Sequence, residues 1–220
     1  LSCGIPQERP MIAPSVARSI LVIVLLCHTG AMRDLDISLF RWINRWPDEL
    51  EPFFRFLSEA TKIWPGRILL AAVLIFCLSR PRLRTAAILG LLAFPLANEC
   101  CDLLKNSMRM PRPCVELPGV LLRGDLLTSF GTASAHSANM ACIAAVFWAF
   151  DRKWGLAWTL VAFFTGLSRI YTGVHYPSQV LLGWAVGAVV GRVAVFVYER
   201  FIPKKTGAEP SSAPDSSSTP

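Results

Sequence analysis

Charge is scarce in this chain of 220 amino acids. Asp, Glu, Lys and Arg make up 17% of it, whereas 53% is hydrophobic and the mean hydropathy is +0.46. This composition excludes an ordinary soluble domain of the same size. The chain also lacks a continuous basic patch, because its 22 Lys and Arg residues lie between apolar stretches despite a net charge of +7. Membrane topology explains that spacing better than nucleic-acid binding does.

A cysteine framework is missing as well. The chain has seven cysteines, an odd number, and no CxxC or Cys/His spacing that is typical of a zinc site. Cys27, Cys77 and Cys142 fall inside apolar stretches, where cysteine commonly serves as a small packing residue. We therefore expect neither a disulfide framework nor a metal site.

Six apolar segments approach the length of about 20 residues that a helix needs to cross a bilayer. They cover residues 14–32, 64–79, 85–104, 132–150, 155–171 and 178–201. The sequence thus predicts an all-α integral membrane protein with about six transmembrane helices. The first segment has a short apolar centre and could be a signal sequence, but we favour a retained helix because the charge pattern requires a crossing there.

Three further features refine this organisation. Pro95 is expected to kink the third span, and Gly183, Gly187 and Gly191 form a smooth stripe where another helix can approach closely. Residues 35–62 mix aromatic and charged residues, which predicts interfacial helix on the membrane surface. We divide the chain into an N-terminal helix with this interfacial segment (1–63), a catalytic membrane domain (64–201) and a disordered cytoplasmic tail rich in Ser and Pro (202–220).

Basic residues gather in three places that the positive-inside rule assigns to the cytoplasm. These are Arg80, Arg82 and Arg84 in one loop, Arg152 and Lys153 in another, and Arg200, Lys204 and Lys205 after the last span. The opposite ends of the same spans then face outward. We expect a multi-pass protein of the cytoplasmic (inner) membrane.

Those outward ends carry three clusters of polar residues, at 105–113, 134–136 and 168–175. The clusters contain two of the three histidines in the chain, His136 and His175. Lys105, Arg112 and Arg169 could hold the oxygens of a phosphate, and Ser134 lies where a helix N-terminus would present free N–H groups. One histidine could attack phosphorus while the other donates a proton to the leaving group.

These clusters resemble the three signature motifs of the type 2 phosphatidic acid phosphatase (PAP2) superfamily, which also contains vanadium haloperoxidases and glucose-6-phosphatase. The first motif matches at Lys105, Arg112 and Pro113. The second, usually Pro-Ser-Gly-His, keeps Ser134 and His136 but has alanine at 133 and 135. The third matches at Ser168, Arg169 and His175, with Gln179 in place of an aspartate.

The resemblance implies a role for each matching residue. His175 would be the nucleophile that forms a phosphohistidine, and His136 the general acid. Lys105, Arg112 and Arg169 would bind the phosphate together with Ser134 and the backbone N–H groups around Ala135. The resemblance also implies a helical core like that of the haloperoxidases, and neither metal nor cofactor.

Two further side chains, Gln179 and Asp102, affect the roles assigned to His175 and Lys105. A neutral glutamine at 179 can still orient His175 across a helical turn but stabilises positive charge on it less than a carboxylate would, so loss of activity remains an alternative. Asp102, three residues before Lys105, is expected to position that lysine.

Taken together, the sequence predicts a phosphatase that acts on a lipid phosphate monoester or pyrophosphate at the outer face of the membrane. The family resemblance offers undecaprenyl pyrophosphate, lipid A 1-phosphate, phosphatidylglycerol phosphate and phosphatidic acid as candidates. The alternatives are a lipid phosphotransferase and a non-enzymatic protein that binds lipid phosphate. The expected partners are the bilayer and the lipid substrate, with no nucleic acid and no obligate protein partner.

Overall fold

The computed structural model describes residues 30–201, and within that range it contains helices and loops but no strand. The helices are α2 (Gly30–Asn44), the 3-10 helix η1 (Asp48–Leu50), α3 (Glu51–Glu59), α4 (Trp64–Ser79), α5 (Pro81–Met108), α6 (Pro113–Glu116), α7 (Ala135–Phe150), α8 (Arg152–Tyr171) and α9 (Pro177–Phe201). The all-α prediction is confirmed. Five of the six predicted spans correspond to α4, α5, α7, α8 and α9. Residues 14–29 of the first predicted span lie outside the described residues, and its last three residues begin α2. The predicted tail, residues 202–220, also lies outside the described residues.

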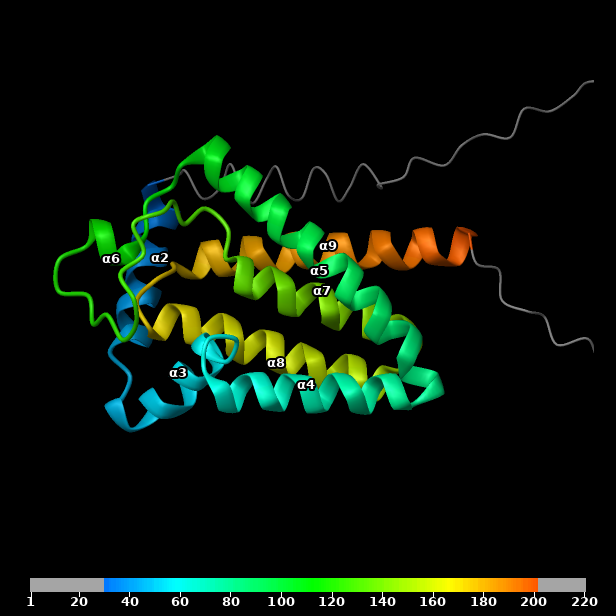
Figure 1. The fold of residues 1–220 in the computed structure, drawn as a ribbon. Coiled ribbons are helices and arrows are strands. Elements are labelled where there is room, and N and C mark those ends of the chain that lie inside the picture. Colours follow the sequence, from blue (N-terminus) through cyan, green and yellow to red (C-terminus); the bar gives the residue numbers. More distant parts are fainter. Residues whose placement is uncertain (1–29, 202–220) are drawn as a thin grey trace, which may run out of the picture.

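Helix α7 is the central helix of the bundle. It packs against α5, α8 and α9, while α4 packs against α5 and the shorter α2 and α3 pack against α8 (Figure 1). Two of these helices begin at a residue whose side chain satisfies the first free N–H groups. Ser134 accepts from the backbone N–H of Ser137 at the start of α7, and Asp151 accepts from those of Lys153 and Trp154 at the start of α8.

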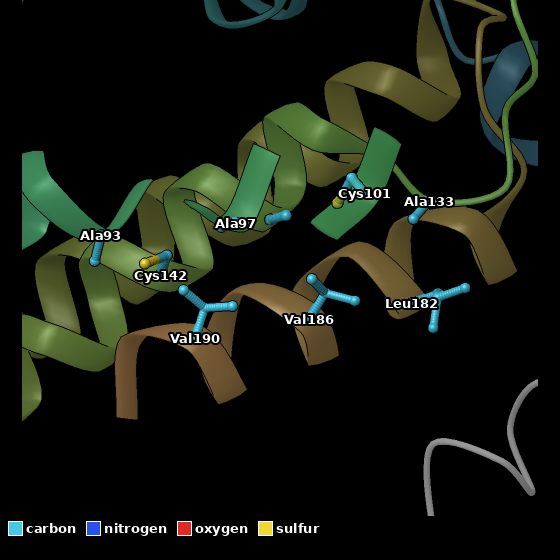
Figure 2. Close-up of a cluster of buried hydrophobic side chains, with 9 residues drawn as sticks. Ala93, Ala97, Cys101, Ala133, Cys142, Leu182, Val186 and Val190 are labelled. Carbon is cyan, nitrogen blue, oxygen red and sulfur yellow. The ribbon is translucent and has the colours of Figure 1, made fainter. Parts of the chain in front are cut away.

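The core between α5, α7 and α9 consists mainly of small side chains. Ala97 and Cys101 of α5 and Cys142 of α7 are fully buried, and Val186 of α9 packs against them (Figure 2). Such short side chains allow the helix backbones to approach one another closely. The prediction that Cys77 and Cys142 are packing residues is confirmed, since both are buried in apolar clusters.

The glycine stripe of α9 faces α7. A Cβ atom added to Gly187 would lie 2.0 Å from the Ala138 carbonyl oxygen, and one added to Gly183 would lie 2.5 Å from that of Ser134. At Gly191 the corresponding distance to the Cys142 carbonyl oxygen is 2.6 Å. The predicted close helix packing is therefore confirmed, and it brings the start of α9 against the start of α7.

Residues 35–62, predicted as interfacial helix, fold into the end of α2, η1 and α3. These elements bury Phe40 and Phe54 against Tyr171 and Tyr176 at one end of the bundle. Their other faces remain exposed, as at Trp42. The segment thus covers the bundle end through a buried aromatic face and leaves a second aromatic face outside.

The two ends of the bundle differ in chemistry. The α4–α5 turn with Arg80 and the α7–α8 turn meet at one end, where the rings of Phe76 and Trp154 pack at an angle of 41° with centroids 5.6 Å apart. At the other end lie α2, α6 and the long connection between α5 and α7 (Figure 1). The three polar clusters all belong to this second end, because they occupy the end of α5, the start of α7 and the α8–α9 connection.

Among the described residues, two helical stretches are long and apolar enough to cross a membrane: Pro81–Glu116, which joins α5 to α6, and Pro177–Phe201. The bent pair Asp48–Glu59 and Trp64–Ser79 meets the same criterion only when its two helices, 58° apart, are taken as one span. Helix α7 is apolar but shorter, with 16 residues. The count of six crossings therefore stays a prediction.

Candidate active site

His175 lies in the connection between α8 and α9 and is buried. Its Nδ1 is 3.0 Å from Oε1 of Gln179, one helical turn further on. The Nε2 group of Gln179 donates to the carbonyl oxygen of Pro111 at 2.8 Å, which fixes the orientation of the amide. Since Oε1 must then accept, Nδ1 of His175 carries the hydrogen and Nε2 carries the lone pair. Gln179 thereby sets the tautomer that a nucleophilic Nε2 requires.

Arg112 contacts the other side of the same ring. Its Nη1 group donates to His175 Nε2 at 2.8 Å and to the carbonyl oxygen of Val174 at 3.0 Å. Its Nε and Nη2 groups donate to Ser129 and to the carbonyl oxygen of Phe130. One contact at Nε and two at each terminal nitrogen occupy all five N–H groups of the guanidinium. An incoming phosphate must therefore take over some of these hydrogen bonds.

His175 is neutral in this environment. Burial lowers the pKa of the ring well below its ordinary value of 6.5, and the positive charges of Arg112 and Arg169 lower it further. The hydrogen bond that His175 donates to Gln179 acts in the opposite direction but does not reverse the shift. A neutral imidazole that carries a lone pair on Nε2 is the form that can attack phosphorus once Arg112 turns to the phosphate.

The N-terminus of α7 joins the second motif to the third. The backbone N–H of Ser134 donates to the carbonyl oxygen of Gln179 at 3.0 Å, while the Ser134 hydroxyl caps the helix. The N–H groups of Ala135 and His136 have no acceptor within the helix, as at any helix start. Together with the helix dipole they favour an anion at this position.

The remaining cations of the motifs are held by polar partners. Lys105 forms an ion pair with Asp102 at 2.7 Å, so the expected contact between them is present. Arg169 is buried and donates through Nη1 to the hydroxyl of Ser58, whereas its Nε has no partner in the described part of the chain. A buried guanidinium with an unused donor is suited to binding an anion.

Two cavities of different chemistry meet near the cations. A small polar cavity of about 20 Å³ is lined by Arg169, Ser58 and Lys62 among others. A larger cavity of about 400 Å³ is lined mainly by apolar side chains of α3, α4, α7 and α8 and has His136 in its wall. Ser58 lines both cavities.

Sequence reasoning missed several residues that build this end of the molecule. Ser58 contacts Arg169 from 111 positions away, and Lys62 lines the polar cavity. Asp36 of α2 accepts hydrogen bonds from the N–H and hydroxyl groups of Ser178, which starts α9 beside His175. No local pattern predicts such contacts. The mixture of aromatic and charged residues in 35–62 predicted only an interfacial helix on the membrane surface.

A helical bundle that gathers buried cations and histidines at one end, above apolar helices, has the architecture of a membrane phosphatase. The family model of the PAP2 superfamily matches residues 84–203, more than half of the chain, and the chain therefore belongs to that superfamily. The family predicted from the three motifs is confirmed, and the protein is a phosphatase of this superfamily.

Three relatives show this similarity, and two of them are named as phosphatases. The chain is 31% identical over 172 residues to the bacitracin transport permease protein BcrC of Bacillus licheniformis, covering 75% of this chain and 80% of that protein. It is 33% identical over 129 residues to decaprenylphosphoryl-5-phosphoribose phosphatase of Mycobacterium tuberculosis, covering 58% and 69%. It is 26% identical over 164 residues to undecaprenyl-diphosphatase of Sulfolobus acidocaldarius, covering 73% and 77%.

Solved structures show the same fold. The crystal structure of LpxE from Aquifex aeolicus matches with a TM-score of 0.64 and 27% identity, over 74% of this chain and 95% of that one. A transmembrane PAP2-type phosphatidylglycerolphosphate phosphatase from Bacillus subtilis matches with a TM-score of 0.67 over 87% and 98%. Its identity of 20% supports the fold alone.

Proposed function

We propose that this protein is a lipid phosphatase that hydrolyses a lipid phosphate monoester or pyrophosphate through a phosphohistidine on His175. The observation that carries the proposal is the hydrogen-bonded series from Pro111 through Gln179 to His175, which leaves Nε2 as the lone-pair nitrogen beside Arg112. Glutamine thus supplies the orientation that an aspartate would supply, without the negative charge.

The reaction follows from the placement of these groups. The Nε2 lone pair of His175 attacks phosphorus, the bond from phosphorus to the leaving oxygen breaks, and protonated His136 gives that oxygen a proton. Arg112, Arg169, Lys105 and the N-terminus of α7 hold the charge on the transferred phosphoryl group. Water then attacks phosphorus, the N–P bond breaks, and the proton lost by water returns to His136.

The apolar cavity supports a lipid substrate. It begins at His136, on the leaving-group side of the proposed reaction, and a second cavity of about 310 Å³ shares part of its lining and continues between α4, α5 and α7. An apolar chain attached to the leaving oxygen would be accommodated there. The names of two relatives specify lipid-linked phosphates, which agrees with this placement.

The site is proposed to face the outside of the cytoplasmic membrane. Its support is the charge asymmetry of the bundle, because the basic α4–α5 and α7–α8 turns lie at the end opposite the motifs. We further propose that residues 64–201 form the catalytic membrane domain, with residues 30–63 contributing Ser58 to its site.

The test is phosphate release by purified protein in detergent from a panel of four lipids: a polyprenyl diphosphate, lipid A, phosphatidylglycerol phosphate and phosphatidic acid. The parent is expected to release phosphate from at least one of them, and His175→Gln is expected to lower the rate at least about 10³-fold, since it removes the nucleophile. A fold check by thermal unfolding accompanies the variant.

Two other outcomes would contradict the proposal. Transfer of the phosphoryl group to an added acceptor lipid, without free phosphate, would indicate a phosphotransferase. Binding of a lipid phosphate with no turnover, equal in the parent and in His175→Gln, would indicate a binding protein whose Gln179 does not support catalysis.

A further inference from the structure

The C-terminal end of α3 forms one wall of the polar cavity beside Arg169, outside all three motifs. Ser58 receives the hydrogen bond from Arg169, and Lys62 lies on the same wall three residues after Glu59. The opposite wall comes from the α6–α7 connection, where Asp125 lines the cavity. This end of α3 therefore adds one cation, Lys62, to the cations of the motifs.

The two acidic residues of the cavity are both engaged with basic partners. Asp125 forms an ion pair with Lys62 at 2.7 Å, and Oε2 of Glu59 lies 3.4 Å from Nε of Arg55. The charge of Glu59 also acts on Arg169. Lys62 and Asp125 are more than half exposed, and an exposed pair of this kind contributes little to stability. Lys62 can therefore exchange Asp125 for a stronger anion.

Lys62 lies on the same side of the site as the proposed general acid. Ser58, one turn before Lys62, lines both the polar cavity and the apolar cavity that contains His136. Lys62 is thus near the point where a leaving group would pass from the polar to the apolar region.

We infer that Lys62 binds the phosphate that remains on the lipid, so that the site selects a lipid diphosphate over a lipid monophosphate. This inference rests on the proposed function. His175 Nε2 would bond to the terminal phosphorus while the bond from that phosphorus to the bridging oxygen breaks. The electron pair of that bond passes to the inner phosphate, which leaves as a lipid monophosphate with its charge held by the Lys62 ammonium.

The size of the polar cavity adds a requirement. A volume of about 20 Å³ accommodates roughly one water molecule and not a phosphate. Entry of the inner phosphate therefore requires Lys62 and Asp125 to separate. A lipid monophosphate has no second phosphate to place there, and its turnover should depend little on Lys62.

The test compares a polyprenyl diphosphate with the polyprenyl monophosphate of the same chain, both in detergent. Lys62→Gln is expected to lower kcat/KM for the diphosphate at least about tenfold, the usual scale for a lost charged hydrogen bond, and for the monophosphate less than about threefold. Lys62→Arg should retain most of the diphosphate rate. Lys153→Gln, which removes an exposed lysine at the basic end, is the matched control and should change neither.

An equal loss on both substrates, no loss on the diphosphate, or a parent that turns over only the monophosphate would overturn the inference. A second measurement, calorimetric binding of inorganic pyrophosphate and inorganic phosphate, applies whatever lipids are hydrolysed. Lys62→Gln should weaken pyrophosphate binding at least about tenfold and leave phosphate binding unchanged. Equal effects on the two ions would contradict the role of Lys62, whereas failure of the parent to hydrolyse any lipid would contradict the proposed function.

Discussion

Gly131 is the residue whose replacement should disturb the site most directly. A Cβ atom there would lie 2.7 Å from Cγ of Arg112 and 2.7 Å from Oε1 of Gln179. Gly131→Ala is therefore expected to push Gln179 off His175 and to lower kcat about 100-fold, the cost of a displacement near 1 Å in a catalytic group. Initial rates of phosphate release measure the effect.

Gly90→Ala is the control for this substitution. Its new methyl group would meet only Cγ1 of Ile143, at 3.8 Å, in the interior of α5. It should keep full activity and gain up to about 1 kcal/mol of stability, because alanine favours a helix over glycine. Unchanged activity in Gly131→Ala would show that the contact between Gln179 and His175 does not matter for turnover.

The depressed pKa of His175 sets the expected pH dependence. A histidine nucleophile must be deprotonated, so the acid limb of kcat/KM that reports His175 should lie well below pH 6.5 in the parent, because the pKa of His175 lies well below that value. Gln179→Glu places a carboxylate beside Nδ1–H, and its negative charge should raise that pKa. The acid limb of its profile would then move to higher pH.

A pH profile of kcat/KM for both proteins, on the same lipid, checks this expectation. The new carboxylate would also face the carbonyl oxygen of Pro111, where the parent amide donates, so a lower thermal stability is expected as well. Coincident acid limbs in the parent and in Gln179→Glu would mean that residue 179 does not act on the protonation of His175.

Part of the site could be predicted from single residues and part could not. The ion pair from Asp102 to Lys105 spans three positions within α5, so helix geometry brings those groups together. The contact from His175 to Gln179 spans four positions, from the connection before α9 into its first turn, so closeness in the sequence made it predictable. The bond from Arg169 to Ser58 joins residues 111 positions apart. Only tertiary packing places Ser58 and Lys62 at the site, and no spacing of residues in the sequence predicts that packing.

At the level of helices, the packing of α9 on α7 determines where His175 and Gln179 lie relative to His136. Gly187→Ala would place a methyl group 2.0 Å from a backbone oxygen of Ala138, which cannot move aside as a side chain can. We expect a loss of about 1–3 kcal/mol of stability, the usual cost of overpacking, together with reduced activity as the Ser134–Gln179 hydrogen bond opens. Thermal unfolding in detergent and phosphate release provide the two readouts.

Leu181→Ala on the same helix is the comparison for Gly187→Ala. The Leu181 side chain is 54% exposed in the structure, so its truncation leaves no buried cavity. It should preserve both the unfolding temperature and the rate. A stable and active Gly187→Ala protein would show instead that α9 can move away from α7 without consequence for the site.

Helix positions were the most predictable level of this structure. The predicted span 64–79 coincides with α4, and the last three predicted spans differ from α7, α8 and α9 by no more than three residues at either end. The third span differs more, because α5 begins at Pro81 and includes Arg82 and Arg84 in its first turn. A pattern of apolar residues does not predict a first turn that is charged. Proline, which is common at the first helical position, does indicate where such a helix begins.

For the whole molecule, the decisive feature is that its two ends carry different groups. The basic turns and the three polar clusters lie at opposite ends of the bundle, as the sequence predicted from loop charges and motif positions. The side of the membrane that each end faces rests on the positive-inside rule. It can be measured with an impermeant thiol reagent on intact cells.

Val115 and Arg82 are suitable positions for that measurement, because Val115 is exposed on α6 at the catalytic end and Arg82 is exposed at the basic end. In a background where Cys114 is replaced by serine, Val115→Cys should react with the reagent on intact cells. Arg82→Cys should react only after the membrane is permeabilised. The reverse pattern would place the site in the cytoplasm, and its substrate would then have to be a phosphate on the inner leaflet, because His175 and the cations beside it reach only one side of the bilayer.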